Sequence, residues 1–328
     1  MLDVFQTDAF STASLTAAIN TLPYVSSRLA PLFAAKPITT TTAVIERQGK
    51  KLALIPARER GNQTTQNVRD PKRIARSLQV VHLPVNDQVL ADEVQNVRAF
   101  GSEDATETVV DLVNSRMETM KQSLELTKEY HRTGAIQGVI LDADGSTTLY
   151  NLFTLFGISE TTHNFDFTLN AQDMKAQSQA IIRLMDTALG GIPRTGIRAI
   201  CGDNFWDSFV SHASVAGAFE RFQDNQFARE QQNRGGFDAF GIVWENYRGS
   251  VAGTPFIPTG ECRFIPEGVP DLFHEVMAPA NFIETVNTTG KPWYAKQAVQ
   301  RFETGVDLHA QSNPLFICTR PEVLIKGY

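Results

Sequence analysis

The longest regular pattern of apolar and polar positions lies in residues 102–133. Apolar side chains recur there at spacings of three and four residues, which is the period of one helix face: Val109, Val113, Met117, Met120 and Leu124. Ser102 is a suitable N-cap, and Gly134 is expected to end the helix. The pattern predicts one amphipathic helix, roughly 48 Å long at about 1.5 Å per residue.

The polar back of this predicted helix is acidic. Six side chains fall in a narrow sector opposite the apolar stripe: Glu107, Asp111, Glu118, Gln122, Glu125 and Glu129. We call the five acids among them the acidic ridge. The simplest interpretation is a core-facing helix with a solvated back, but the ridge is also a candidate contact surface.

Residues 1–35 are predicted to form an arm, because their apolar residues are too few to close a core. Two short helical pieces are expected in it, over residues 11–20 and 26–34. Residues 39–48, 51–56 and 77–85 are rich in β-forming residues and predict strands.

A basic segment separates these strands. Residues 46–76 hold nine basic and three acidic residues, a local charge of +6 that leaves −12 for the rest of the chain. Six of the basic residues are candidate contact residues: Arg58, Arg60, Arg69, Lys72, Arg73 and Arg76. The flanking strands predict a two-stranded excursion that leaves and rejoins one sheet, and such a ribbon is marginal without a surface to lie on. A solvated mobile loop is one alternative. A nucleic-acid loop is another, although residues 57–76 lack aromatic residues for base stacking.

The second half of the chain predicts an α/β arrangement. Asp144-Gly145 lies between two short apolar runs and indicates a hairpin turn, in preference to a calcium loop. Helices are expected over 169–189, over 204–212 with Asp203 as cap, and over 214–230. A buried strand is expected at 197–202, and further strands at 241–247, 261–266, 273–279, 295–303, 305–310 and 314–320.

Composition narrows the class of protein. With 42% hydrophobic and 20% charged residues, the chain can build a sizeable core. Its net charge of −6 argues against nucleic-acid recognition as the main task. Three widely spaced cysteines without a CxxC pair indicate buried thiols. The sequence has neither a secretory signal nor a long apolar run, so we expect a soluble protein made in the cytoplasm.

The sequence carries none of the common catalytic motifs. There is no phosphate-binding lysine loop and no GxGxxG after a strand. His274-Glu275 begins like a zinc protease motif, but Ala278 stands where the second ligand belongs. The six histidines are scattered without ligand-like pairing. The sequence therefore predicts no catalytic, cofactor-binding or metal-binding residues, although an enzyme remains possible.

The order of parts resembles the tailed-phage major capsid proteins of the HK97 fold, and more narrowly the lambda-like capsid protein E family. Three stretches carry the resemblance: HRTGAIQGVILDADG at 131–145, IRAICGDNFWDSFVSH at 197–212, and the run from 291 to 328. The last is the most specific, with its aromatic start, its Asn313-Pro314 break and its closing RPEVLIKG.

The resemblance implies an α+β fold with named parts. These are an N-terminal arm (1–35), an extended hairpin called the E-loop (46–82), a peripheral domain with a spine helix (36–45, 83–190 and 291–328), and an α/β axial domain (191–290). It implies a non-enzymatic coat protein of the virion, whose copies form pentamers and hexamers of an icosahedral shell around double-stranded DNA. Implied partners are a separate scaffolding protein, a portal, a decoration protein in some relatives, and non-specifically the packaged DNA, with no membrane and no cofactor.

The charges suggest a hypothesis about assembly. In this hypothesis, the E-loop of one subunit lies across the spine helix of another. Basic residues such as Arg58 and Arg60 would then pair with the acidic ridge. Alternatively the ridge faces the interior, where an acidic lining keeps DNA from sticking. Two other classes of protein stay open from the residues alone: a soluble cytoplasmic α/β enzyme, and another virion subunit such as a tail or decoration protein.

Overall fold

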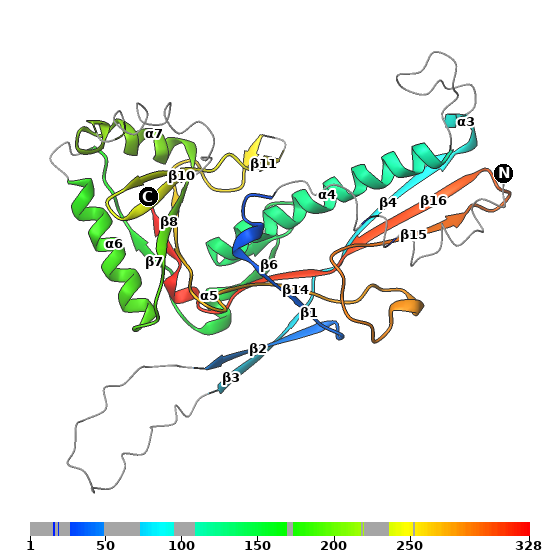
Figure 1. Cartoon of the computed structure of the whole chain (residues 1–328), viewed down its shortest axis with the longest axis horizontal. Coiled ribbons are helices and arrows are strands. Elements are labelled where there is room, and N and C mark those ends of the chain that lie inside the picture. The colour runs from blue at the N-terminus through cyan, green and yellow to red at the C-terminus, as the bar shows by residue number, and fades with distance from the viewer. Residues whose placement is uncertain are drawn as a thin grey trace, which may run out of the picture. The chain divides into compact units, whose positions relative to one another are not determined.

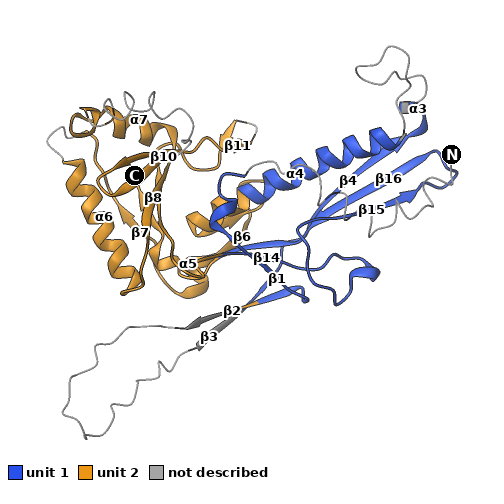
Figure 2. Cartoon of the chain, viewed as in Figure 1, with its two compact units in different colours: residues 1–43, 77–129, 274–317 blue, residues 44–76, 130–273, 318–328 orange. Residues whose placement is uncertain are grey.

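The computed structural model describes residues 16, 19, 27–48, 73–94, 109–168, 173–217, 219, 236–251 and 253–328 (Figure 1). Of these, the side chains of 45–48, 73–76, 94 and 109 are not described. The chain divides into two compact units (Figure 2). Unit 1 comprises residues 1–43, 77–129 and 274–317, and unit 2 comprises 44–76, 130–273 and 318–328. The predicted division into arm, E-loop, peripheral domain and axial domain stays a prediction.

Helix α4, Val109–Gln137, confirms the predicted long helix. Val113, Met117, Met120 and Leu124 are buried, so the apolar stripe is the core-facing side. They cluster with Val89, Ala295, Val306, Leu308 and Ala310 of a three-stranded antiparallel sheet, order β15-β16-β4. Its strands are β4 (Leu83–Leu90), β15 (Tyr294–Val299) and β16 (Gly305–Ser312). In Figure 1 the helix runs alongside these strands.

The expected stop at Gly134 is wrong. The helix continues through this residue to Gln137, and Gly138 then takes a positive φ of 80°. Gly134 serves close packing instead, because a Cβ there would lie 2.9 Å from the Val139 carbonyl oxygen. The helix start predicted at Ser102 lies outside the described residues.

A hairpin follows the helix, as predicted. Strands β5 (Val139–Leu141) and β6 (Thr148–Asn151) pair antiparallel. Between them Asp144 Oδ1 accepts hydrogen bonds from the backbone N–H groups of Ser146 and Thr147. The hydrogen bond from the Thr147 hydroxyl, together with these backbone bonds, holds the pKa of the Asp144 carboxyl well below its usual range. The acid thus closes a turn.

The segment around the basic region differs from expectation. Strands β2 (Thr42–Gln48) and β3 (Arg73–Gln79) pair with each other, but form a separate two-stranded sheet. The strand before them, β1 (Ala34–Pro37), belongs to a sheet of order β1-β14-β17, whereas β4 after them belongs to the sheet under α4. The excursion therefore does not leave and rejoin one sheet. The predicted strand 51–56 lies outside the described residues.

The remaining elements of unit 1 are short. Strands β14 (Phe273–Met277) and β17 (Pro314–Cys318) complete the sheet with β1, and both were predicted. Of the helical piece expected over 26–34, only the 3-10 turn η2, Ala30–Leu32, forms, because Ala34–Pro37 pairs as a strand with β14. Helix α3 is Ala91–Val94, and η4 is Ile283–Thr285. In the arm, Thr16 and Ile19 are helical.

Unit 2 is built on a six-stranded mixed sheet of order β7-β18-β13-β8-β10-β9. Its strands are β7 (Thr161–His163), β8 (Gly196–Cys201), β9 (Phe237–Ala239), β10 (Ile242–Asn246), β13 (Cys262–Glu267) and β18 (Ile325–Gly327). Aromatic rings of Phe165, Phe205, Phe209, Trp244 and Phe264 pack together as its core. The three cysteines are buried and free, and Cys201 faces Cys262 across β8 and β13.

The helices of unit 2 are α5 (Leu152–Phe156), α6 (Met174–Leu189) and α7 (Asp203–Ser211). Asp173 caps α6 and Gly190 ends it in the left-handed conformation. The expected cap by Asp203 is wrong: Gly202 holds the cap position, and Asp203 Oδ1 accepts a bond from Asn246 Nδ2. Most of the helix expected over 214–230 lies outside the described residues. The smaller elements are β11 (Ser250–Val251), β12 (Thr254–Pro255) and η5 (Pro321–Val323).

We expect Gly138→Ala to lower the free energy of unfolding by about 2–4 kcal/mol. Alanine is strained at a positive φ, and a Cβ would lie 2.3 Å from Cε2 of Phe153, so the ring must move. Gly145→Ala is the matched control, because its φ is +69° but no atom lies within 4 Å of the added Cβ. Denaturant unfolding of the full chain measures both. Equal losses in the two variants would contradict a steric role for Phe153.

Candidate functional site

The structure divides the acidic ridge into an exposed part and a buried part. Asp111 and Glu118 are exposed on α4, as predicted. Glu125 and Glu129 are only 3% and 8% exposed, so the expected solvated back is wrong for this half of the helix. Glu107 lies outside the described residues. Only the part of the ridge nearer the start of α4 is therefore accessible to another molecule.

Two lysines enclose the ring of Trp293 in the interior of unit 1. Lys121 and Lys128 are seven residues apart and so lie on one side of α4. Their Nζ atoms are 4.5 Å and 4.6 Å from the centre of the Trp293 ring. Both lysines are 2% exposed, so these cation–π contacts are made away from water, where they are strongest.

Glutamates balance the charge of these lysines. Lys128 Nζ lies 3.1 Å from Glu125 Oε1 and 2.8 Å from Oε1 of Glu275 on β14. Two lysines and two glutamates thus form a neutral group around Trp293, which we call the buried ionic cluster. Burial lowers the pKa of the Lys121 ammonium, and the nearby Glu125 opposes that shift.

The next acid along α4 holds the N-terminal arm. Glu129 Oε1 accepts a hydrogen bond of 3.0 Å from the backbone N–H of Leu29. The arm is also held at a second place, where the Thr16 hydroxyl bonds the backbone of Ala295 and Ile19 is fully buried in the core of unit 1. Glu129, which was expected to face solvent, therefore binds the arm instead.

Sequence reasoning did not find the buried ionic cluster. Lys121 and Lys128 adjoin Leu124 of the apolar stripe, which is a weak sign of burial. Their partners Glu275 and Trp293 are more than 140 residues away in the sequence, and no periodicity links them.

The predicted basic contact residues are only partly placed. Arg58, Arg60, Arg69 and Lys72 lie outside the described residues. Arg73 and Arg76 are in β3, but their side chains are not described. Whether the basic segment meets the acidic ridge stays a prediction.

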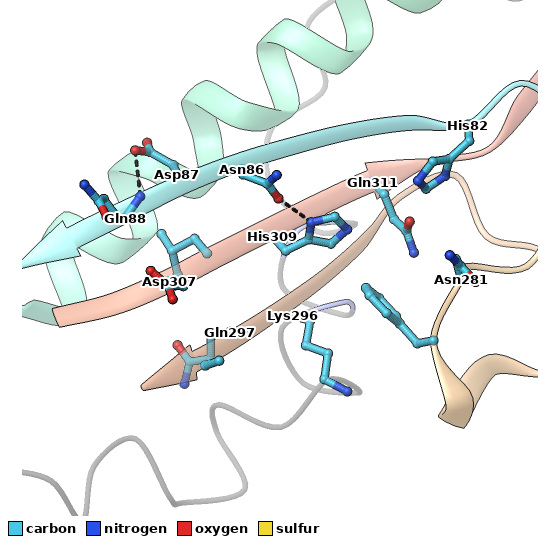
Figure 3. Close-up of a pocket in the computed structure, with 13 residues that line it drawn as sticks. His82, Asn86, Asp87, Gln88, Asn281, Lys296, Gln297, Asp307, His309 and Gln311 are labelled. Carbon is cyan, nitrogen blue, oxygen red and sulfur yellow. Dashed lines mark hydrogen bonds between the residues drawn. The ribbon is translucent and has the colours of Figure 1, made fainter. Parts of the chain in front are cut away.

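A groove of about 880 Å³ lies along strands β4, β15 and β16 (Figure 3). Polar residues of the three strands line it, and Phe282 adds an aromatic wall. His309 Nδ1 and Asn86 Oδ1 form a hydrogen bond, and burial lowers the pKa of the His309 imidazole. Asp87, Asp307 and Lys296 also line the groove, so it offers charged and hydrogen-bonding groups for contact.

In the described ranges, no three histidine, cysteine, aspartate or glutamate residues gather as metal ligands would. No helix of the described residues is long and apolar enough to cross a membrane.

Comparison with known proteins identifies relatives. Residues 11–328 match the family model of phage major capsid protein E. The major capsid protein of Pseudomonas phage KPP10 is 27% identical over 316 residues, which cover 90% of each chain. A phage-related protein from Bordetella bronchiseptica RB50 has a similar structure, with a TM-score of 0.54, 10% identity and 95% of each chain covered. The capsid of an empty GTA particle gives a TM-score of 0.50 at 10% identity, covering 93% of this chain and 90% of that one.

We expect Lys128→Met to lower the free energy of unfolding by about 3–5 kcal/mol, because the buried ionic cluster then keeps two glutamates and one lysine, an excess negative charge. Lys128→Met combined with Glu275→Gln should recover part of the loss, since it makes the cluster neutral again. Glu118→Gln, on the exposed side of the same helix, is the control and should change little. Denaturant unfolding, monitored by tryptophan fluorescence, measures all three variants. An unchanged free energy of unfolding in Lys128→Met would refute the role of the cluster.

Proposed function

The chain belongs to the phage major capsid protein E family, and from this premise we propose that its copies associate into pentamers and hexamers of an icosahedral shell around double-stranded DNA. It is a major capsid protein of a tailed phage with an HK97-like capsid fold, and a component of the virion. The observation that carries the proposal is the family match over residues 11–328. The role is structural and not enzymatic, and the protein is made in the host cytoplasm.

Two features of the chain support assembly through neighbouring subunits. The sheet of β2 and β3 has two strands only, and an isolated pair is marginal in water. Val44 on β2 is 61% exposed, so this strand carries an apolar side chain that its own unit does not cover. A neighbouring subunit that lies against the pair would bury this side chain. Head-to-tail contacts of this kind form closed rings when their rotation closes.

We retain the charge hypothesis in a narrower form. The basic residues between β2 and β3 of one subunit meet Asp111, Glu118 and Glu107 of another, whereas Glu125 and Glu129 act inside their own unit. Each exposed pair contributes only about 0–1 kcal/mol, but the contact recurs at every subunit. In the alternative, these acids line the interior and repel DNA. The scaffolding, portal and decoration partners stay predictions.

The first test is the assembly state of the full chain after expression in bacteria. We expect capsomer rings or closed shells in negative-stain electron microscopy and an early-eluting peak in size-exclusion chromatography. A stable monomer, both alone and with the other head proteins of its phage, would refute the proposal.

The second test is charge reversal at the exposed acids. Asp111→Lys with Glu118→Lys should reduce the particle yield at least tenfold, because like charges then meet at each contact. Adding Arg58→Glu and Arg60→Glu should restore it. Asp186→Lys with Asp207→Lys, on helices α6 and α7, is a control of equal charge change. Normal particles with altered DNA packaging would instead support the interior location.

A further inference from the structure

The tip of the β15–β16 hairpin presents a phenylalanine to solvent. Phe302 is 84% exposed, although its aromatic ring is among the most apolar side chains in the chain. The turn around it is well defined: Gln300 N–H donates to the Gly305 carbonyl at 3.0 Å, and Glu303 N–H donates to the Gln300 carbonyl at 2.9 Å. The ring is therefore displayed by an ordered turn.

The backbone at this tip is strained. Phe302 and Glu303 have φ values of +74° and +61°, in the left-handed region that glycine and asparagine adopt most readily. A bulky residue there is unfavourable for the isolated subunit, and exposure of the ring adds to the penalty. Strained positions of this kind are typical of functional contacts.

The hairpin holds its tip in a fixed direction. Strands β15 and β16 pair in register up to Val299 and Val306, and β16 also pairs with β4, from Gly305 opposite Leu90 onward. Val306 belongs to the core under α4. Because the base of the hairpin is anchored, Phe302 loses little conformational freedom when it is buried by a partner.

We propose that Phe302 is an anchor that inserts into an apolar recess of a second copy of this chain. The inference rests on the proposed function, since a coat protein meets other copies of itself in the shell and every copy presents this hairpin. Arg301 supports it, because its guanidinium lies 5.4 Å from the ring and both Phe and Arg are enriched at protein interfaces. The contact is heterologous, with the tip of one copy in the recess of the next.

The first experiment compares the stability of the isolated subunit with its ability to assemble, because the proposal predicts that one variant changes the two in opposite directions. Phe302→Asn suits the left-handed backbone, so the unfolding midpoint of the purified subunit should stay equal or rise. The yield of sedimenting particles should nevertheless fall at least tenfold relative to the original chain. Phe302→Tyr retains the ring and should keep the yield within twofold. Particles of Phe302→Asn at the original yield would overturn the proposal.

The second experiment identifies the partner. The full chain with p-benzoyl-phenylalanine at position 302 is assembled, irradiated and digested for mass spectrometry. We expect chain-to-chain crosslinks in particles and none in dissociated subunits. Crosslinks only to another virion protein, or none in intact particles, would overturn the proposal. Absence of particles from the unsubstituted chain would instead refute the proposed function, so the two failures are distinguishable.

Discussion

The packing of helix α4 on the β15-β16-β4 sheet is the constraint on which the rest of unit 1 depends. The first part of the contact is apolar, from Val113 to Leu124, and hydrophobic burial there is non-directional. The second part is the buried ionic cluster, in which each contact needs a particular partner at a particular distance. Lys128 therefore fixes the register between α4, Glu275 of β14 and Trp293 in a way that apolar packing alone does not. Glu129 extends the same ordering to the arm at Leu29.

The elements that sequence predicted well are those set by local pattern. The period of Val113, Met117, Met120 and Leu124 predicted α4, and β-forming runs predicted the strands β10, β13, β14, β15, β16 and β17, but not β11, β12 or β18. The buried charges were not predictable in this way. Glu125 looks solvated on a helical projection, and what buries it is a lysine three residues on, together with groups far along the chain. A helical projection shows on which side of the helix a side chain lies, but not which other residues pack against that side.

Glycine explains two further differences between sequence and structure. Gly134 was expected to end a helix because glycine is common after helix ends. It lies inside α4 because backbone from β5 passes where a side chain would be. Gly202 displaces Asp203 from the cap of α7 for a related reason, since a Cβ at 202 would lie 2.4 Å from the Pro258 carbonyl oxygen. At both positions glycine is required because backbone from another part of the chain passes close by. Sequence rules for helix ends do not include such long-range contacts. Of the candidate contact residues, the pattern placed Asp111 and Glu118 correctly on the surface.

The six-stranded sheet of unit 2 sets the order in which a newly made subunit becomes complete. Strand β18 lies between β7 and β13, and pairs with Thr161–His163 on one side and Cys262–Phe264 on the other. The ribosome makes both neighbours earlier, and they have no pairing with each other until Ile325–Gly327 arrives. The sheet is therefore divided in two throughout translation up to this strand. The six-stranded sheet is thus complete only once β18 has been made and has paired with both neighbours.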